Sequence, residues 1–302
     1  MRIGLDIGGT KTDAVALDRT GREAARVRRT TGFGPDAVLA GAEAAVRAVV
    51  ARAGAVLADV DAVGVGIPGV IDEESGDVRH AVNLGVAELA LSTRLSGRLG
   101  LPVTVENDVK AAALGAYHLL GLSGSAALLN LGTGLAAGIV VDGRLWRGAR
   151  GSAGEIGHIP IDPGGAACSC GQVGCLETVA SGSAVTRLWQ STAALPAVEL
   201  FDRADAGDGR AVEVRRTLVG GVAAAVRMLA LSVDVETIII GGGLSGLGER
   251  LAVPVAEALA DWAVSSAFLA SLELPSRVRM LPIGVSAAAV GAALLGAQTE
   301  LV

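Results

Sequence analysis

Short hydrophobic stretches with strand-like alternation are separated by longer stretches of helical periodicity along the 302-residue chain. Residues 3 to 29 follow the pattern of three β-strands joined by a glycine-rich loop and a turn, with the middle strand at 13–17 and the turn at 18–21. A helix is predicted near residues 35–53. Because strands alternate with helices throughout, we predict an α/β fold with two lobes and a cleft between them.

The opening pattern of strand, glycine turn and strand occurs again 124 residues further along the chain. Residues 128–134 (LLNLGTG) and 138–141 (GIVV) repeat it, and a hairpin turn is predicted at Asp142-Gly143 before residues 144–146. The offset pairs Asp6 with Asn130, Gly8 with Gly132, and Asp18 with Asp142.

A second echo relates residues 101–103 and 111–116 (LPV and AAALGA) to residues 281–283 and 287–292 (LPI and AAAVGA). We interpret both echoes as the trace of a duplicated α/β unit. Coincidence in a sequence rich in alanine and glycine is the alternative.

Composition favours a small molecule as the ligand. Hydrophobic residues make up 51% of the chain, so it can bury a large core, and this length usually means two domains or lobes. The 25 Lys and Arg residues against 31 Asp and Glu residues give a net charge of −6, and no basic block marks a nucleic-acid-binding surface. We therefore expect no nucleic-acid partner.

The sequence also favours a cytoplasmic protein without a membrane partner. The N-terminal MRIGLDIGGT reaches Asp6 without an apolar segment or a small-residue cleavage site, so no signal peptide is predicted. The longest stretch without a charged residue or histidine, Leu119 to Val141, is long enough to span a bilayer, but glycines and polar residues interrupt it. We interpret it as two buried strands around a turn.

A glycine turn with phosphate-binding chemistry follows the first strand, at residues 6–11 (DIGGTK). The glycines let backbone amides approach phosphate oxygens, Thr10 adds a hydroxyl donor, and Asp6 offers a carboxylate that suits Mg²⁺, directly or through water. It is not a Walker A loop, because Lys11 follows Thr10 rather than a glycine and no helix begins there. An ordinary glycine-rich hairpin is the alternative.

The second turn, Gly132-Thr133-Gly134, is the natural partner that would hold the same phosphates from the other lobe. Asn130 stands there in place of the carboxylate, so only the first turn is expected to hold the metal.

Glu106-Asn107-Asp108 lies between a predicted strand at 102–105 and a helix that begins near Val109. A carboxylate there projects from the carboxyl end of a strand, the usual ligand side of an α/β sheet. Asn107 could bind a hydroxyl while Asp108 accepts its proton as a general base. The spacing supports equally well an N-cap role for Asp108 in the following helix.

All three cysteines, Cys168, Cys170 and Cys175, lie within eight residues, and His158 precedes them. Three thiolates and one imidazole form a closed tetrahedral set, which predicts a structural zinc without an open position for an activated water. The C-x-C spacing is tighter than the common C-x₂₋₄-C spacing, and idle or redox-active thiols are the alternative.

Glu155 and His158 lie three residues apart and would share one face if their segment is helical. His158 could bind zinc through one ring nitrogen and present the other to a hydroxyl or a carboxylate, which would couple the zinc loop to a substrate. Without the neighbouring cysteines, such a pair is more often a pair of surface groups.

Residues 241–246 match G-x-G-x-x-G after a predicted strand at 237–240. Asp261, about twenty residues on, lies inside a predicted helix at 254–263 rather than at a strand end, so the ribose-binding part of a dinucleotide fingerprint is missing. We interpret the motif as a glycine turn against a nucleotide base or ribose, and an oxidoreductase is a distant alternative.

Five motifs together resemble the ROK family of sugar kinases and sugar-responsive repressors over nearly the whole chain. They are DIGGTKT at 6–12, ENDV at 106–109, LGTG at 131–134, GEIGH at 154–158 and CSCGQVGCLE at 168–177. The resemblance implies the two-lobed actin-like, ribonuclease-H-like ATPase fold, with a C-terminal helix at about 286–302 that packs on the N-terminal lobe. We accordingly place a small α/β lobe at 1–107 and a large lobe with the zinc loop at 108–285.

The resemblance also implies roles for individual residues. It makes Asp108 the base that takes the proton from a sugar 6-hydroxyl as that hydroxyl attacks the γ-phosphate of ATP. The remaining sugar-binding residues are Asn83, Asn107, Glu155, His158 and Glu177. The nucleotide-binding residues are Asp6, which would serve Mg²⁺, Gly8, Gly9, Thr10, Lys11, Gly132, Thr133, Gly134, Gly242 and Gly243. The zinc ligands are His158, Cys168, Cys170 and Cys175.

The region after Asn83-Leu84 departs from the family pattern. Family kinases often place an aromatic residue shortly after an Asn-Leu pair, whereas Gly85-Val86-Ala87 follow here. The family's repressors carry an N-terminal helix-turn-helix segment, and this chain begins at the phosphate-loop strand, so we expect a kinase rather than a DNA binder.

We predict an ATP-dependent hexose 6-kinase acting on glucose, N-acetylglucosamine or N-acetylmannosamine, and a homodimer or homotetramer. A catalytically silent sugar-binding sensor of the same fold is the alternative.

Overall fold

The computed structural model describes residues 1–298 and divides the chain into two compact units. The first unit consists of Met1–Gly124, Gly138–Gly151 and the chain from Val285, and the second consists of Ser125–Ala137 and Ser152–Gly284. The lobes 1–107 and 108–285 stay a prediction about domain organisation. The last four residues of the predicted C-terminal helix, 299–302, lie outside the described residues.

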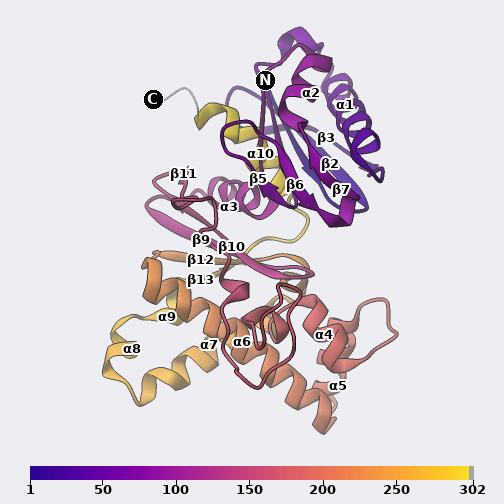
Figure 1. Cartoon of the computed structure of the whole chain (residues 1–302). Coiled ribbons are helices and arrows are strands. Elements are labelled where there is room, and N and C mark those ends of the chain that lie inside the picture. Colours follow the sequence, from indigo (N-terminus) through magenta and orange to yellow (C-terminus); the bar gives the residue numbers. More distant parts are fainter. Residues whose placement is uncertain (299–302) are drawn as a thin grey trace. The chain divides into compact units, whose positions relative to one another are not determined.

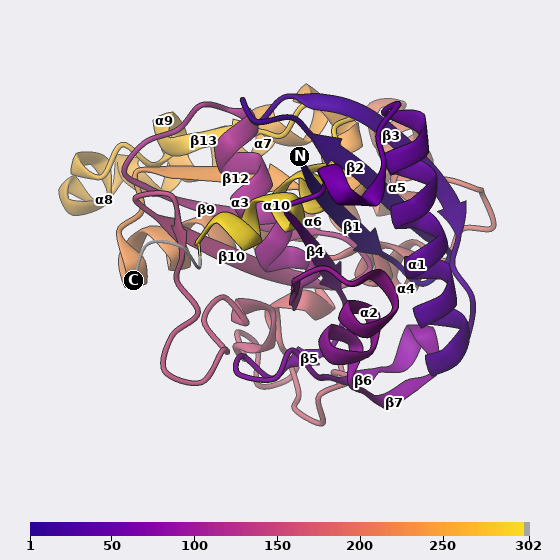
Figure 2. The same cartoon turned by 90° about the horizontal axis from the view of Figure 1, so that it is seen from above.

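A five-stranded sheet forms the centre of the first unit, in the order β3-β2-β1-β4-β8. Strands β1, β4 and β8 run parallel, and β2 and β3 extend the sheet in antiparallel pairing. Helices α1 and α2 cover one face, and α3 and α10 cover the other (Figures 1 and 2). A small sheet in the order β5-β6-β7 precedes α2 in the chain. The bounds in this unit are β1 Arg2–Ile7, β2 Lys11–Leu17, β3 Glu23–Thr30, α1 Pro35–Arg52, η1 Leu57–Asp59, β4 Ala62–Ile67, β5 Val70–Ile71, β6 Val78–Ala81, η2 Val82–Leu84, β7 Val86–Leu89, α2 Leu91–Leu99, β8 Val103–Asn107, α3 Asp108–Leu119, β11 Arg144–Leu145 and α10 Ala287–Gln298.

Glycines in two neighbouring strands let α10 lie directly on the first sheet. Gly4 of β1 and Gly64 of β4 are partners in the parallel register. A Cβ atom would lie 1.9 Å from the Ala289 carbonyl oxygen at Gly4, and 1.8 Å from the Ala292 carbonyl oxygen at Gly64. Both strands therefore need glycine at this level, because a methyl group would push the helix off the sheet.

Helices α3 and α10 cross each other through a reciprocal pair of glycines. A Cβ atom at Gly115 would lie 1.9 Å from the Ala287 carbonyl oxygen, and one at Gly291 would lie 1.7 Å from the Ala111 carbonyl oxygen. These are the two alanine- and glycine-rich segments that the second sequence echo pairs. Their composition follows from the close approach of two helix backbones.

The second unit contains the parallel strands β9, β12 and β13, and a turn at Gly132 joins β9 to β10. Strand β10 passes from the second unit into the first between Ala137 and Gly138. The bounds are β9 Ser125–Leu131, β10 Leu135–Val141, η3 Ile156–His158, η4 Leu176–Thr178, α4 Gly182–Trp189, α5 Pro196–Asp205, α6 Gly209–Val233, β12 Thr237–Gly241, η5 Gly243–Leu247, α7 Glu249–Val264, α8 Ala267–Ser271, α9 Leu274–Arg277 and β13 Val278–Met280.

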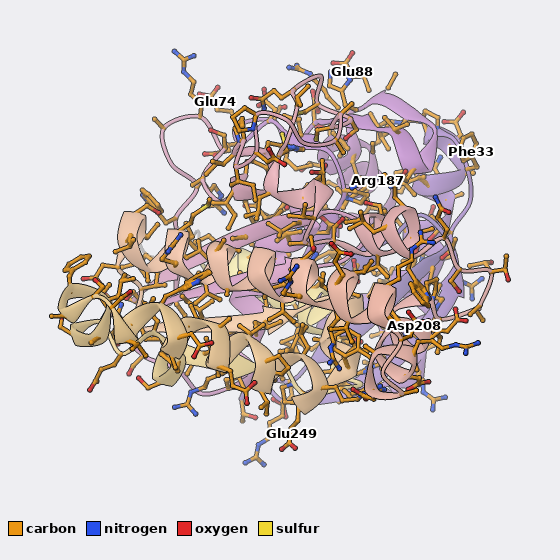
Figure 3. The ribbon with its side chains drawn as sticks, turned by 90° about the horizontal axis from the view of Figure 1, so that it is seen from below. Phe33, Glu74, Glu88, Arg187, Asp208 and Glu249 are labelled. Carbon is orange, nitrogen blue, oxygen red and sulfur yellow. The ribbon has the colours of Figure 1, made fainter. Side chains whose placement is uncertain are left out.

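Helix α6 is, within residues 1–298, the one helix long and apolar enough to cross a membrane by length and composition. Half of its most apolar window is buried inside the protein. Asp208 caps its first turn by accepting the Ala211 N–H at 3.0 Å (Figure 3).

The two five-stranded sheets have the same strand order. The second sheet runs β11-β10-β9-β12-β13, which matches β3-β2-β1-β4-β8 position by position. The shared order supports the predicted duplication. The Leu-Pro part of the second echo is wrong, because Leu101-Pro102 precede β8 whereas Leu281-Pro282 follow β13.

Most predicted elements agree with the structure. The predicted helix at 35–53 is α1, and the hairpin turn at Asp142-Gly143 has the two positive φ angles, 49° and 77°, of a type I′ turn. The predicted helix at 254–263 begins earlier, at Glu249, and Pro254 lies inside it. Pro254 is the sixth residue of the helix, where it lacks the N–H that would bond to the Arg250 carbonyl oxygen, and the helix continues through it.

Candidate active site

The first glycine turn joins β1 to β2 and is exposed at Gly9, Thr10 and Lys11. Within the turn, the Gly8 N–H donates to the Lys11 carbonyl oxygen at 2.9 Å. The Thr10 carbonyl oxygen accepts the Thr31 N–H at 3.1 Å. These bonds fix the backbone while exposed groups of the turn remain accessible, as phosphate binding requires.

Asp6 lies at the carboxyl end of β1 among other charged groups. Burial, and then the charges of Asp108 and Asp13, raise the pKa of Asp6 to about 7, and Arg28 opposes the rise. Arg28 donates two hydrogen bonds to Asp13, at 2.6 and 2.8 Å. The donor set consists of carboxylate oxygens, and their mutual repulsion would be relieved by a divalent cation, so these residues fit Mg²⁺.

Asn107, not Asp108, is the N-cap of α3. The Asn107 Oδ1 accepts the N–H groups of Val109 at 3.0 Å and Lys110 at 3.3 Å, and the helix begins at Asp108. Asp108 also accepts the Val109 N–H, at 2.9 Å. The N-cap alternative for Asp108 is therefore wrong, because the preceding amide fills that position.

Strand β4 separates Asp6 from the start of α3. In the parallel register Gly66 pairs with Asp6 on one side and with Glu106 on the other. A Cβ atom at Gly66 would lie 3.6 Å from the Asp108 Cα atom. The glycine keeps side-chain atoms out of the space beside Asp108.

Asn83 lies beside the first glycine turn. A Cβ atom at Gly9 would be 3.4 Å from both the Cβ atom and the carbonyl oxygen of Asn83. The structure therefore brings a predicted sugar-binding residue next to a predicted phosphate-binding residue within the first unit.

A phenylalanine ring from a different segment lies next to the Asn83-Leu84 pair. Phe33, in the loop between β3 and α1, is 76% exposed, and a Cβ atom at Gly85 would lie 2.5 Å from its Cε1 atom (labelled in Figure 3). The Gly34 N–H holds this loop by donating to the Leu84 carbonyl oxygen at 2.8 Å. An aromatic ring is thus present in this region, although the sequence after Asn83-Leu84 contains none.

In the second unit, Glu155 and His158 lie on a single 3₁₀ turn. The His158 N–H donates to the Glu155 carbonyl oxygen at 3.2 Å. Glu155 is exposed and His158 is partly exposed, so both side chains are accessible.

His158 and the three cysteines form one cluster. Their ligand atoms all lie within 4.8 Å of one another, with 3.7 Å between the Cys170 and Cys175 Sγ atoms and 3.7 Å between Cys168 Sγ and His158 Nδ1. A Zn–S bond of about 2.3 Å implies tetrahedral edges of about 3.8 Å, so the cluster fits zinc.

The thiol pKa values reflect the crowding of the cluster. Hydrogen bonds from Gln172 lower the pKa of Cys170 to about 6. Burial raises the pKa of Cys168, and burial with the neighbouring thiols raises that of Cys175 to about 12. A bound cation would favour the thiolate form of all three.

Glu177 connects the cysteine cluster to the second glycine turn. Its Oε1 accepts the Cys168 thiol at 3.3 Å and lies 3.8 Å from His158 Nδ1, while its Oε2 accepts the Leu135 N–H at 3.3 Å. A Cβ atom at Gly134 would lie 2.7 Å from that Oε2. Both carboxylate oxygens are therefore engaged inside the second unit.

The second turn lines a pocket of about 1010 Å³ in the second unit. The Gly132 and Thr133 carbonyl oxygens accept N–H groups from Gly182 at 2.8 Å and Ser183 at 3.1 Å. Leu195, Leu244 and other apolar side chains supply the walls, as a flat heteroaromatic base requires. The lining residues include Gly132, Thr133, Gly182, Ser183, Thr186, Arg187, Leu195, Pro196, Val198, Gly243, Leu244 and Leu247.

Gly242, the residue before η5, lies beside this pocket. Its φ is +80°, and a Cβ atom would lie 2.5 Å from the Leu131 carbonyl carbon, so the backbone of η5 packs on the end of β9. The G-x-G-x-x-G match is therefore a strand-to-3₁₀ turn, and Gly243 lines the pocket with Gly132 and Thr133.

Several residues of the site carry no sequence motif. In the first unit, Arg28 lies near Asp6 because β2 and β3 pair, and Phe33 contacts Gly85 because its loop packs there. In the second unit, Leu195 lines the pocket beside Gly132. An aromatic residue flanked by glycines, in TGFG at 31–34, is a signal that could have identified Phe33.

Known proteins resemble this chain closely in sequence and structure. The chain is 34% identical to the glucokinase of Halalkalibacterium halodurans over 261 residues, covering 80% of this chain and 78% of the relative. The ROK hexokinase from Thermus thermophilus is 32% identical, with a TM-score of 0.82 and 99% of each chain covered. A ROK family glucokinase from Streptomyces griseus, solved with glucose and AMPPNP, is 32% identical, with a TM-score of 0.80 and coverage of 98% and 99%.

A regulator also shares this architecture. A ROK family transcriptional regulator is 28% identical, with a TM-score of 0.75, over 97% of this chain and 76% of the regulator. The solved structures confirm the predicted actin-like α/β fold. The sequence profile of the ROK family matches residues 2–299. Since this match covers nearly the whole sequence, the chain belongs to the ROK family.

Proposed function

We propose that this protein is an ATP-dependent hexose kinase that phosphorylates the 6-hydroxyl of its sugar, with Asp108 as the general base. The observation that carries the proposal is the strand register, in which Gly66 pairs with Asp6 on one side and with Glu106 on the other. Asp108 follows at the start of α3, so a Mg²⁺-type carboxylate and a candidate base lie at the same end of the first sheet. The glucokinase relatives favour glucose as the first sugar to test, and an N-acetylhexosamine as the second.

In this proposal Asp108 accepts the proton of the sugar hydroxyl while the hydroxyl oxygen bonds to the γ-phosphorus and the bond to ADP breaks. Most of the rate of such a reaction comes from positioning and charge stabilisation. Asn107 has its Oδ1 committed to the helix cap, and its Nδ2 donates to the Gly69 carbonyl oxygen at 3.3 Å. It therefore has one N–H left for a sugar oxygen.

The remaining sugar ligands in the proposal are Asn83, Glu155, His158 and Glu177. Both Glu177 oxygens already accept hydrogen bonds within the second unit. A carboxylate oxygen accepts more than one hydrogen bond, so Glu177 keeps capacity for a sugar hydroxyl.

Each unit contributes its own proposed nucleotide-binding residues. Gly8 to Lys11 and Gly132 to Gly134 would contact the phosphates, and the apolar pocket beside Gly243 would hold the adenosine. Asp6 would hold Mg²⁺, which when bound neutralises phosphate charge. His158, Cys168, Cys170 and Cys175 would hold a zinc ion that orders their loop.

A coupled assay for ADP release with a panel of hexoses and hexosamines tests the function. Turnover is expected with at least one sugar, and Asp108→Asn should lower kcat by about 10²- to 10⁴-fold, the usual contribution of a general base. The fold should survive, because Asn107 supplies the cap. Asp36→Asn, in the first turn of α1, is the matched control and should keep wild-type kcat.

A silent sugar sensor is the second candidate, since a transcriptional regulator shares this fold at 28% identity. A sensor would bind a sugar in calorimetry and release no ADP with any member of the panel. That outcome would refute the kinase proposal. We also expect the protein to be cytoplasmic. It should form a homodimer or homotetramer, and light scattering would check this oligomeric state.

A further inference from the structure

Glu106, the residue before Asn107 and Asp108, is buried and uses both carboxylate oxygens. One oxygen accepts the Asn107 N–H at 2.8 Å, and the other accepts the Arg147 Nε–H at 2.6 Å. The Glu106 side chain is 6% exposed and that of Arg147 is 29% exposed. A charge-assisted bond this short, to a carboxylate this buried, holds its partners more firmly than a fully exposed ion pair does.

A second link lies one turn further along α3. Lys110 is buried, and its Nζ donates to the Gly151 carbonyl oxygen. Gly151 has a φ of +71°, which favours glycine. Arg147 and Gly151 belong to one segment of the first unit, so this segment is bonded on both sides of Asn107-Asp108.

Neither link belongs to the chemistry described above. Glu106 faces Arg147 rather than Asp6, and the Lys110 ammonium is committed to a carbonyl oxygen. The segment 147–151 continues in sequence to Glu155, four residues after Gly151, which is among the proposed sugar ligands. The two links therefore connect the start of the base-bearing helix to the segment that leads into the sugar-binding motif.

We propose that Arg147 is a positioning residue for phosphoryl transfer. Through Glu106 it fixes the backbone at Asn107 and hence the place of Asp108, and Lys110 supports the same helix start. This role rests on the proposed hexose kinase function. A misplacement of about 1 Å at a reacting group lowers the rate about 10²-fold, so a loosened helix start should affect kcat before it affects ATP binding.

The test compares Arg147→Met, Arg147→Lys and the double variant Glu106→Gln with Arg147→Met. Arg147→Met should lower kcat about 10- to 100-fold while KM for ATP stays within about twofold. Arg147→Lys restores a cation and one donor, so it should recover part of kcat. The double variant removes the unpaired buried carboxylate, so its Tm should return toward wild type while its kcat stays low.

Arg94→Met is the matched control, because Arg94 pairs with Asp36 at 2.7 Å on the surface of the same unit. It should leave kcat unchanged. Wild-type kcat in Arg147→Met, or kcat that recovers together with Tm in the double variant, would overturn the positioning role.

Hydrogen exchange separates a failure of this role from a failure of the kinase function. Amides at residues 107–110 should exchange at least about tenfold faster than in the wild type in Arg147→Met and in the double variant. This result does not depend on whether any sugar is phosphorylated. Unchanged exchange there would overturn the link itself. A wild-type protein without turnover would overturn only the kinase proposal.

Discussion

The two glycine turns occupy the same place in two sheets of identical strand order, yet they are built differently. The first turn follows Asp6, whose pKa is raised to about 7 by burial and by Asp108 and Asp13. The second follows the neutral Asn130 and is held by Glu177 at Leu135 and by the start of α4. One architecture thus supports a turn that follows a carboxyl group in one unit and a turn held by hydrogen bonds in the other.

This difference shows where each kind of chemistry can develop after a duplication. A buried carboxyl group with a raised pKa marks a candidate functional site, and a bound cation would favour its ionised form. The corresponding polar groups of the second unit are the cysteine cluster and Glu177. Glu177 accepts the Cys168 thiol with one oxygen and holds the backbone of the turn at Leu135 with the other. The same strand ends therefore carry a carboxyl group in one unit and a hydrogen-bonded turn beside an apolar pocket in the other.

The largest effect is expected at the cluster of His158 and the three cysteines in the second unit. We expect about one zinc per chain by elemental analysis, and Cys175→Ser should lose the metal and several kcal/mol of stability, since Cys175 is fully buried. Thermal unfolding with and without a chelator checks this. A metal-free protein of undiminished stability would contradict the zinc site.

Asp6→Asn makes the first turn resemble the second. We expect kcat to fall about 10²- to 10³-fold, the loss typical when one electrostatic group is removed from a reaction centre. Steady-state kinetics at saturating Mg²⁺ checks the change. The reciprocal variant Asn130→Asp should give no gain in kcat, and equal losses from both variants would show that the two turns are interchangeable.

The raised pKa of Asp6 has a consequence for stability in the absence of metal. Between about pH 4 and pH 7 the folded chain keeps the Asp6 proton that the unfolded chain has released, so the free energy of unfolding should fall as pH rises. The fall should level off above about pH 7 and amount to about 4 kcal/mol at most. Urea unfolding with a chelator measures it, and Asp6→Asn should flatten this part of the profile.

Gly134→Ala disturbs the hydrogen bond between Glu177 and Leu135 at the second turn and should have the smallest effect. The new methyl group would lie 2.7 Å from Glu177 Oε2, so the carboxylate must move and loosen its bond to Leu135. We expect KM for ATP to rise about fivefold, equivalent to about 1 kcal/mol. Gly220→Ala, in α6 with open space around it, is the control and should slightly stabilise the protein. An unchanged KM would show that Glu177 does not support the turn.

The sequence predicted the residue types of the site better than their partners. Asp6, Asp108 and the cysteine cluster stand out because carboxylates at strand ends and closely spaced cysteines have few other uses. The choice between base and helix cap for Asp108 stayed open, because two polar residues at the end of a strand offer equally good caps. Only the hydrogen bonds of Asn107 assign the cap.

For the glycines, the sequence predicted the turns but not the close contacts between backbones. The GGT and GTG segments were correctly predicted to be turns, whereas no close contact was predicted for Gly4, Gly64, Gly115 or Gly291. They are contact points, because helix backbones approach them closely. A pattern along the chain cannot show which backbone will arrive from elsewhere.

By itself the sequence determined the alternation of strands and helices, the repeated hairpins and the close spacing of the three cysteines, since each of these depends on residues close together in the chain. Only the tertiary structure decided the pairing of Arg147 with Glu106, the contact of the Phe33 ring with Gly85 and the shift in the pKa of Asp6. Those features depend on distances between residues far apart in sequence, and such distances are fixed only when the sheets and helices pack.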